Sequence, residues 1–409
     1  MHSPESSRPD TALAGTAGEA VAHYLHVQAG DFLRSLRRHG ESGAETAAVA
    51  ESAQALRTVS RRISGTLHTF RPLLDPAWAD GLRTELAWLS TTLAQEHAYT
   101  SRLSRLLDAL SRLSGTAPLP SARSDALPRD GFGLPAGHLG TTGCDAGCDA
   151  PDEADGSPHA SNGSSAGDTD GRTSTGTGTG RKPARAGGRS GASAGGGVLA
   201  VGAARAGALL ERQLTLARTR AHSAALQALG SSRFHAVADA VALLVSDLPL
   251  GPAAAGPAAQ TLALPAEAAE RRLLEAVAGL PLGRAAHPYN AEALVNGLAT
   301  TAAGEAQDAP WHEVRRLLRL HRYAQEVVRP GSSPVLCQAG LVLDRHRDAA
   351  EAAAAAATAA RTPRIAPATA YALGVLHADQ RHEVEAARFA FQQQWRHATA
   401  AASSAVPAP

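Results

Sequence analysis

The stretch DAPWHEVRRLLRLHRYAQE, residues 308–326, predicts an amphipathic helix, because its apolar residues recur every three to four positions. At about 100° per residue, one side of this helix is apolar: Val314, Leu317, Leu318, Ala324 and Val328. The opposite side carries basic side chains: His312, Arg315, Arg316, Arg319 and Arg322. Glu326 is the acid in reach of this row, and Glu313 is predicted to point elsewhere. The row therefore favours an external polyanion or acids from a neighbouring helix, and the alternative is a solvated or salt-bridged helix face.

A second stretch, QALRTVSRRISGTLHTFRPLL at residues 54–74, repeats this pattern. Its apolar face carries Leu56, Val59, Ile63 and Leu67, and its polar face carries Gln54, Arg57, Arg61 and His68. Superposing the two copies pairs three polar positions: Arg57 with Arg315, Arg61 with Arg319, and Gln54 with His312. This recurrence, together with matching apolar positions, predicts an internal duplication.

The organisation of the chain follows from changes in composition. Residues 18–113 and 199–398 have helical periodicity, and few segments alternate with period two. Residues 114–198 are rich in Gly, Ser and Thr and cannot bury enough apolar surface to fold, so they are predicted to be a disordered insert. The tails 1–17 and 399–409 are predicted to be disordered as well. The predicted fold class is all-α, with two related antiparallel helical bundles that arise from the duplication.

Two sequence devices predict where helices begin. In DPAW, residues 75–78, Asp75 is expected to cap a helix whose first residue is Pro76. DAPW, residues 308–311, repeats this device. The four tryptophans lie in or beside apolar helical patterns and are predicted to pack in the core: Trp78, Trp88, Trp311 and Trp395.

Composition argues against several classes of protein. The net charge of +1 requires any anion site to come from local clustering of charge. Aromatic residues make up 4% of the chain, too few for a base-stacking surface, so no specific nucleic-acid recognition is expected. No apolar run reaches membrane-spanning length, and the first residues lack a secretion-signal pattern. We expect a soluble, cytoplasmic protein without a membrane partner.

The cysteines and histidines do not indicate a metal centre. Cys144 and Cys148 lie in the Gly/Ser-rich tract with only His138 and His159 nearby, and Cys337 is isolated. Free thiols in a reducing compartment are the expected state. No phosphate-binding loop, no Gly-x-Ser-x-Gly sequence and no paired acids stand out, so no enzyme activity, cofactor or metal is predicted.

The segment HEVRRLLRLHRYAQE resembles the signature helix of the CHAD family, the conserved-histidine α-helical domain. Four further segments resemble other parts of this family in the same order: residues 56–89, 210–244, 341–352 and 373–396. The resemblance covers most of residues 18–398, with the Gly/Ser-rich tract as an insertion. It implies two related helical bundles around a basic cavity that binds inorganic polyphosphate without catalysis, and it suggests association with polyphosphate granules.

The resemblance implies a set of ligand-binding residues. The second repeat would contribute His312, Arg315, Arg316, Arg319 and Arg322, and the first Arg57, Arg61 and Arg62. His346 stands where the family commonly has another histidine, with Asp348 just beyond it. A further basic cluster in ARTRAHSAA comprises Arg218, Arg220 and His222.

Departures from the family pattern weaken the first repeat and leave a second interpretation open. Gln54 replaces the first-repeat histidine, His97 and Ala98 replace an Arg-Asp pair, and Leu320 stands where a basic residue is usual. The sequence EVEAAR, residues 383–388, lacks the lysine of the Glu-x-Glu-x-Lys strand found in triphosphate-processing companions of the family. The alternative is a degenerate scaffold or protein-interaction module that has lost strong polyphosphate binding. Arginines from both halves in one groove would favour binding, and arginines paired with local acids would favour the scaffold.

Overall fold

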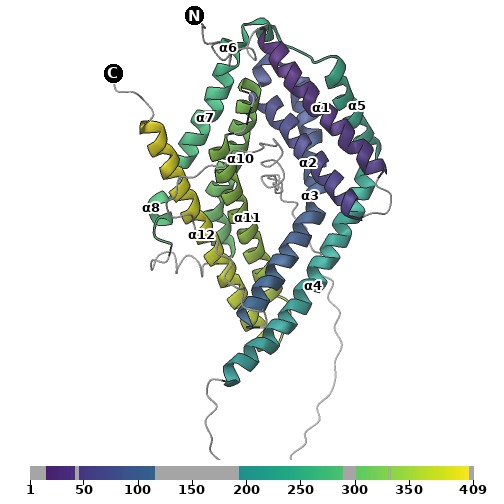
Figure 1. The fold of residues 1–409 in the computed structure, drawn as a ribbon. Coiled ribbons are helices and arrows are strands. Elements are labelled where there is room, and N and C mark those ends of the chain that lie inside the picture. The colour runs from purple at the N-terminus through teal and green to yellow at the C-terminus, as the bar shows by residue number, and fades with distance from the viewer. Residues whose placement is uncertain are drawn as a thin grey trace, which may run out of the picture.

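The computed structural model of the chain describes residues 15–41, 46–115, 193–288, 301–329, 331 and 333–404. Within these ranges the protein is helical and contains no β-strand, which confirms the all-α prediction (Figure 1). The longer helices are α1 (Ala17–Glu41), α2 (Thr46–Thr69), α3 (Pro76–Leu113), α4 (Ser193–Leu229), α5 (Ser232–Ser246), α7 (Ala263–Ala278), α10 (Thr301–Val328), α11 (Pro334–Ala360) and α12 (Pro367–Ser404). The short helical turns are η2 (Arg71–Leu73), η3 (Pro252–Ala255), α6 (Ala258–Thr261) and α8 (Leu282–Ala285).

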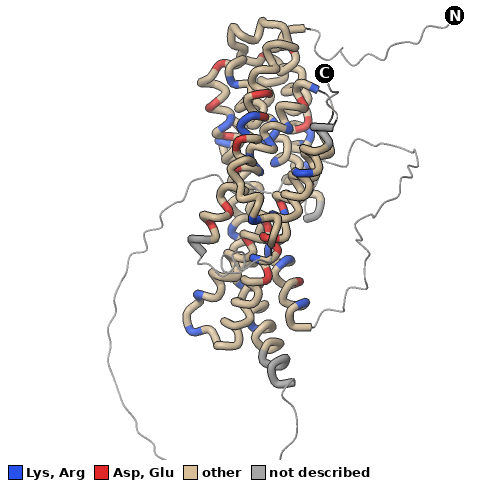
Figure 2. The backbone as a smooth tube through the Cα atoms, turned by 90° about the vertical axis from the view of Figure 1, so that its left-hand side faces the viewer, with Lys and Arg blue, Asp and Glu red and all other residues tan. Residues whose placement is uncertain are grey.

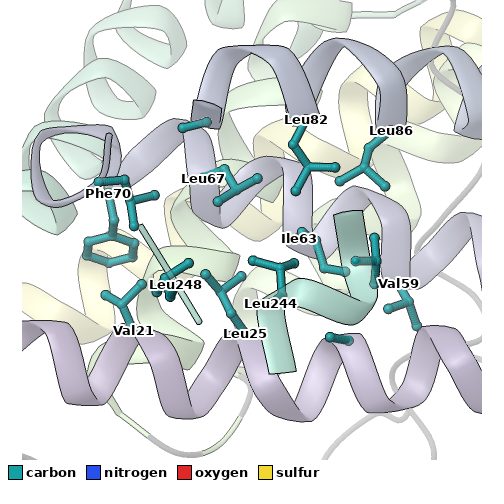
Figure 3. Close-up of a cluster of buried hydrophobic side chains, with 14 of the residues drawn as sticks. Val21, Leu25, Val59, Ile63, Leu67, Phe70, Leu82, Leu86, Leu244 and Leu248 are labelled. Atoms are coloured by element: carbon teal, nitrogen blue, oxygen red, sulfur yellow. The ribbon is translucent and has the colours of Figure 1, made fainter. Parts of the chain in front are cut away.

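One bundle is built from α1, α2, α3 and α5. Figure 3 shows its interior, where side chains from these helices interdigitate. The predicted apolar face of α2 is buried in this core, including Leu56, Ile63 and Leu67. Burying each such side chain contributes about 1.5–3 kcal/mol. Because α5 packs on α1, the two bundles do not follow the division of the chain at the insert.

The second bundle is built around α10, α11 and α12. Its core includes Trp311, Val314 and Leu318 from the stretch quoted first, together with Val342 of α11 and Phe391 of α12. The helix α7 packs against α10, and α4 lies against both α3 and α12. Figure 1 shows α10 and α11 beside the α2–α3 pair, so the two copies of the repeated pattern face each other.

A close crossing of α2 and α10 joins the two halves. A Cβ atom on Gly65 would lie 2.6 Å from Cδ2 of Tyr323, nearer than side chains tolerate. Glycine at this position therefore lets the backbone of α2 approach the Tyr323 ring. The side chains that flank this crossing on both helices are consequently held close together.

The predicted packing of the tryptophans is confirmed. Trp311 is buried, and Trp78 and Trp88 are partly buried against the first core. Trp395 packs in the same way against the second core. These rings therefore stabilise the bundles.

Helix starts were predicted with mixed success. The Asp75 side chain accepts a hydrogen bond of 2.8 Å from the backbone N–H of Trp78, and Pro76 is the first residue of α3, as predicted. The parallel prediction for DAPW is wrong, because α10 begins at Thr301 and Pro310 lies inside it. Asp308 is therefore not a helix cap, and its carboxylate has the different partners described below.

Helix boundaries near the predicted disordered segments also differ. The helix α4 begins at Ser193, inside the predicted insert, and α12 continues to Ser404, inside the predicted tail. The sequence HATAAASS at the end of α12 is rich in alanine, the best helix former, which accounts for the extension. The rest of the insert, with Cys144 and Cys148, lies outside the described residues, as do residues 1–14 and 405–409.

Within the described ranges, none of the helices is both long and apolar enough to cross a membrane alone. The segments Leu199–Leu229 and Ser232–Ser246, bent by 59° at their junction, pass that test only as a pair.

Candidate functional site

A cavity of about 770 Å³ lies between the two halves of the protein. Its walls come from four helices, α2 and α3 on one side and α10 and α11 on the other. The basic side chains that line it are Arg61, His68, Arg83, His312, Arg316, Arg319 and Arg347. Basic groups from both copies of the repeated pattern thus converge on one cavity, which is the arrangement expected of a polyanion site.

The sequence identified some of these groups and missed others. Arg61, His312, Arg316 and Arg319 were predicted site residues, and all four line the cavity. Arg83 and Arg347 were not predicted. Arg347 follows His346 directly in the sequence RHRD, so its neighbourhood was recognised but not its side chain. Arg83 lies in α3 within LRTEL, where the sequence alone gives no sign that α3 faces α10.

The two copies place equivalent arginines in equivalent environments. Arg57 and Arg315, which pair in the sequence superposition, are each 1% exposed. Neither is among the residues that line the cavity, whereas their downstream equivalents Arg61 and Arg319 both are. In each repeat the first arginine is therefore buried in the protein, and the second faces the cavity.

Arg315, predicted to contact the ligand, is buried and already has an acidic partner. Its Nε donates a hydrogen bond to Oδ1 of Asp344 on α11, and both side chains are buried. Burial raises the pKa of Asp344 above its usual value, although Arg315, Arg319 and Arg347 act in the opposite direction. Arg315 thus joins α10 to α11 inside the bundle.

Arg62 and Arg322, also predicted to contact the ligand, are not among the residues that line the cavity. Both are buried and face Glu326, with Nε to carboxylate distances of 3.2 Å for Arg62 and 3.7 Å for Arg322. The hydroxyl of Tyr24 on α1 donates a third contact to Glu326 at 2.7 Å. The predicted proximity of Glu326 to Arg322 is confirmed, and this network joins α1, α2 and α10.

His346 was predicted to contact the ligand. It is buried against Trp311 and is not among the residues that line the cavity. The two rings stack with centroids 5.5 Å apart, and Arg388 Nε lies 3.3 Å from His346 Nε2. Burial of the ring is the main reason that the pKa of His346 lies well below its usual value, and nearby arginines lower it further. The histidine is therefore neutral near pH 7, which makes it a packing and hydrogen-bonding group.

Asp308 of DAPW and two residues of EVEAAR belong to one buried network. The Asp308 carboxylate accepts hydrogen bonds of 2.6 Å from Arg381 Nη1 and from Arg388 Nη2, both on α12. Arg388 also donates to Glu385 at 2.6 Å, so Glu385 and Arg388 of EVEAAR belong to one buried network. As expected, this segment lies in a helix. The network fixes α12 against α10 at the edge of the cavity, where Asp308 is a lining residue.

The cluster Arg218, Arg220 and His222 lies on the exposed side of α4. None of the three lines the cavity, and His222 Nδ1 contacts Glu96 of α3 at 2.9 Å. The prediction that they join the ligand site is not supported by this placement. The sequence showed a basic cluster but not the direction in which α4 presents it.

Acidic groups moderate the charge of the cavity. Glu305, Asp308, Glu313 and Glu351 line it together with the arginines. Glu313, expected to point elsewhere, forms an ion pair of 2.6 Å with Arg316. Arg347 lies 3.3 Å from Glu351 and also contacts Asp348. Figure 2 shows the same mixture across the fold, with basic and acidic residues interleaved along the helices.

Burial is the main cause of the pKa shifts of both cavity histidines, and the charges around them act in both directions. Burial lowers the pKa of His68 to about 4, and Arg83, Arg316 and Arg272 add to this effect. Burial also lowers the pKa of His312, with Asp308 acting in the opposite direction and Arg315 adding to the effect. In the described part of the chain, no group of three or more His, Cys, Asp or Glu side chains could hold a metal ion.

Comparisons with known proteins identify the family to which this chain belongs. The chain is similar to the solved structure of PptA from Streptomyces chartreusis, with 49% sequence identity and a TM-score of 0.65. That match covers 93% of this chain and 100% of the other. No match is found among curated proteins. A family model for the CHAD domain matches residues 28–143 and 197–336, more than half of the sequence. The chain therefore belongs to the CHAD domain family.

Proposed function

We propose that this protein binds inorganic polyphosphate in the cavity between its two halves and does not catalyse a reaction on it. The observation that carries the proposal is the convergence of Arg61 and Arg83 from one half with Arg316, Arg319 and Arg347 from the other. The established membership of the CHAD family supports the choice of ligand, because polyphosphate binding is the activity that the family implies.

The chemistry of the cavity suits a long chain of phosphates. Guanidinium groups are planar, remain charged when buried and form paired hydrogen bonds with phosphate oxygens. Each charge-assisted hydrogen bond contributes about 1.5–3 kcal/mol before the costs of desolvation and ordering. Helices hold these donors at fixed positions, which lowers the ordering cost. Several contacts of this kind are sufficient for useful affinity without recognition of any base or side chain.

The carboxylates in the cavity affect the strength of binding. Arg316 and Arg347 already have acidic neighbours, so a polyanion must compete with Glu313 and Glu351 for them. These acids also repel the ligand directly. We therefore expect affinity that is moderate and strongly dependent on salt, since each arginine that contacts the chain replaces a bound counterion.

Calorimetric titration of the full chain with long-chain polyphosphate at low and high salt tests the proposal. We expect saturable heat at low salt and an affinity that falls steeply as salt increases. The matched control is the double replacement Arg218→Ala with Arg220→Ala, which removes two arginines from the exposed side of α4 and should leave affinity unchanged. Absence of association at low salt would overturn the proposal.

The second candidate is a scaffold or protein-interaction module that keeps the helical fold without strong ligand binding. The buried pairing of Arg315 with Asp344 and the contacts of Arg62 and Arg322 with Glu326 favour it, because those arginines hold helices together. The same titration separates the two candidates. If binding is found, a fluorescent fusion of the chain should concentrate on polyphosphate granules in cells that contain them.

A further inference from the structure

His68 occupies a place in the cavity that the family pattern does not predict. The helix α2 has Gln54 where the family has its first-repeat histidine. On the same helix, near its end, His68 is one of the residues that line the cavity, and Gln54 is not. The cavity thus has one histidine from each half, His68 from α2 and His312 from α10.

The surroundings of His68 come from every helix that faces it. Arg83 and Asp80 lie on α3, Arg316 on α10 and Arg272 on α7. Arg83 and Arg316 line the same cavity, where Glu313 pairs with Arg316. Nδ1 of His68 is buried and has no hydrogen-bond partner among the described residues. Partial burial and the neighbouring cations both oppose a proton on this ring.

We propose that His68 takes up a proton when polyphosphate enters the cavity and becomes a charged contact for the phosphate chain, so that binding is tighter at lower pH. This inference rests on the proposed function of the same site. It assigns to His68 the role of the histidine missing at position 54, and it gives the site a dependence on pH.

Binding of polyphosphate and protonation of His68 are linked through electrostatics. A polyanion between Arg83 and Arg316 neutralises the field that keeps His68 uncharged and adds negative charge beside the ring. The pKa of His68, about 4, must therefore rise on binding. Asp80 also favours the charged ring, whereas Arg272 opposes it. By linkage, a group whose pKa rises on binding makes affinity increase as pH falls, up to about ten-fold per pH unit for one proton.

The test is calorimetric titration of the full chain with long-chain polyphosphate at pH 6 and pH 8. Each titration is done in two buffers of different ionisation enthalpy, so that the number of protons taken up is measured. Long chains make the titration of the terminal phosphates negligible. The variants are His68→Gln, His68→Arg and, as the matched control, His222→Gln on the exposed side of α4. Circular dichroism at both pH values confirms that each variant is folded.

The wild type and His222→Gln should bind about ten-fold more tightly at pH 6 than at pH 8, with proton uptake. His68→Gln should take up about one proton fewer than the wild type and lose the corresponding part of this dependence, while His312 of the same cavity remains. His68→Arg should bind at pH 8 at least as tightly as the wild type binds at pH 6, because its charge is permanent and no proton has to be taken up. If polyphosphate binds but His68→Gln keeps the proton uptake and pH dependence of the wild type, the role of His68 is refuted and the proposed function stands. If the wild type binds at neither pH, the proposed function itself fails.

Discussion

The two copies of the arginine pattern, on α2 and α10, differ less in their arginines than in what surrounds them. Arg57 and Arg315 are equally buried, and Arg61 and Arg319 both line the cavity. On α10 the buried arginine pairs with Asp344 of α11. On the α3 side, the Arg-Asp pair expected from the family is replaced by His97 and Ala98, and Arg57 is among the charges that lower the pKa of His97.

This comparison separates two uses of one residue type. The first arginine of each copy is buried, and on α10 it joins two helices through Asp344, whereas the second arginine of each copy lines the cavity between the halves. A row of arginines on a helical wheel is therefore not a row of ligand contacts, because neighbouring helices cover part of it. The following predictions sharpen this distinction.

The largest expected effect is on stability, at the buried pair. Arg315→Ala should lower the free energy of unfolding by about 3 kcal/mol, because Asp344 loses its hydrogen-bonded counterion in a buried site. This value is at the low end of the range for breaking a buried ion pair, because Arg319 and Arg347 also favour the charged form of Asp344. Urea unfolding measures it. Arg316→Ala is the control, because its pair with Glu313 is about half exposed and should contribute less than about 1 kcal/mol. Equal losses for the two variants would contradict the division into buried and cavity arginines.

A smaller effect is expected at the junction of the halves. Gly65→Ala should destabilise the protein by about 1–3 kcal/mol, because the added methyl group would collide with the buried ring of Tyr323. Gly81→Ala in α3 is the matched control: nothing lies within 4 Å of its Cβ position, and alanine favours the helix by about 0.5–1 kcal/mol. Thermal unfolding should move in opposite directions for the two variants. A neutral Gly65→Ala would mean that α2 and α10 are not in close contact there.

Acid should weaken the second bundle through His346. The pKa of His346 lies well below 6.5 in the folded protein. Above pH 6.5 the ring is therefore neutral in both the folded and the unfolded state, and its effect on the free energy of unfolding no longer changes with pH. As pH falls below about 6.5, this histidine becomes protonated in the unfolded chain but not in the folded protein. His346 therefore contributes up to about 1.4 kcal/mol per pH unit to the loss of stability. Urea unfolding at pH 7.5, 6.0 and 5.0 should show this slope, reduced in His346→Gln and retained in His222→Gln. An unchanged slope in His346→Gln would assign the acid sensitivity to other groups.

The sequence predicted the features that depend on periodicity and missed those that depend on neighbours. The buried face of α10 and the cap at Asp75 depend on single helices, and both are present. The predicted equivalence of Arg61 and Arg319 depends on the repeated pattern, and both residues line the cavity. Asp308, predicted to be a cap, instead binds arginines of α12 more than seventy residues away. Arg83 was missed for the same reason, because its place in the cavity depends on how α3 faces α10.

The central claim is that both halves contact one ligand in one cavity. The most direct test is the salt dependence of polyphosphate affinity for Arg61→Ala, Arg319→Ala and the double variant. Each single replacement should weaken binding about ten-fold and reduce the slope of log affinity against log salt by about 1, because one phosphate contact is lost. The double variant should lose both contributions. If either single variant binds like the wild type while the other abolishes binding, only one half holds the chain, and the account of a shared cavity is contradicted.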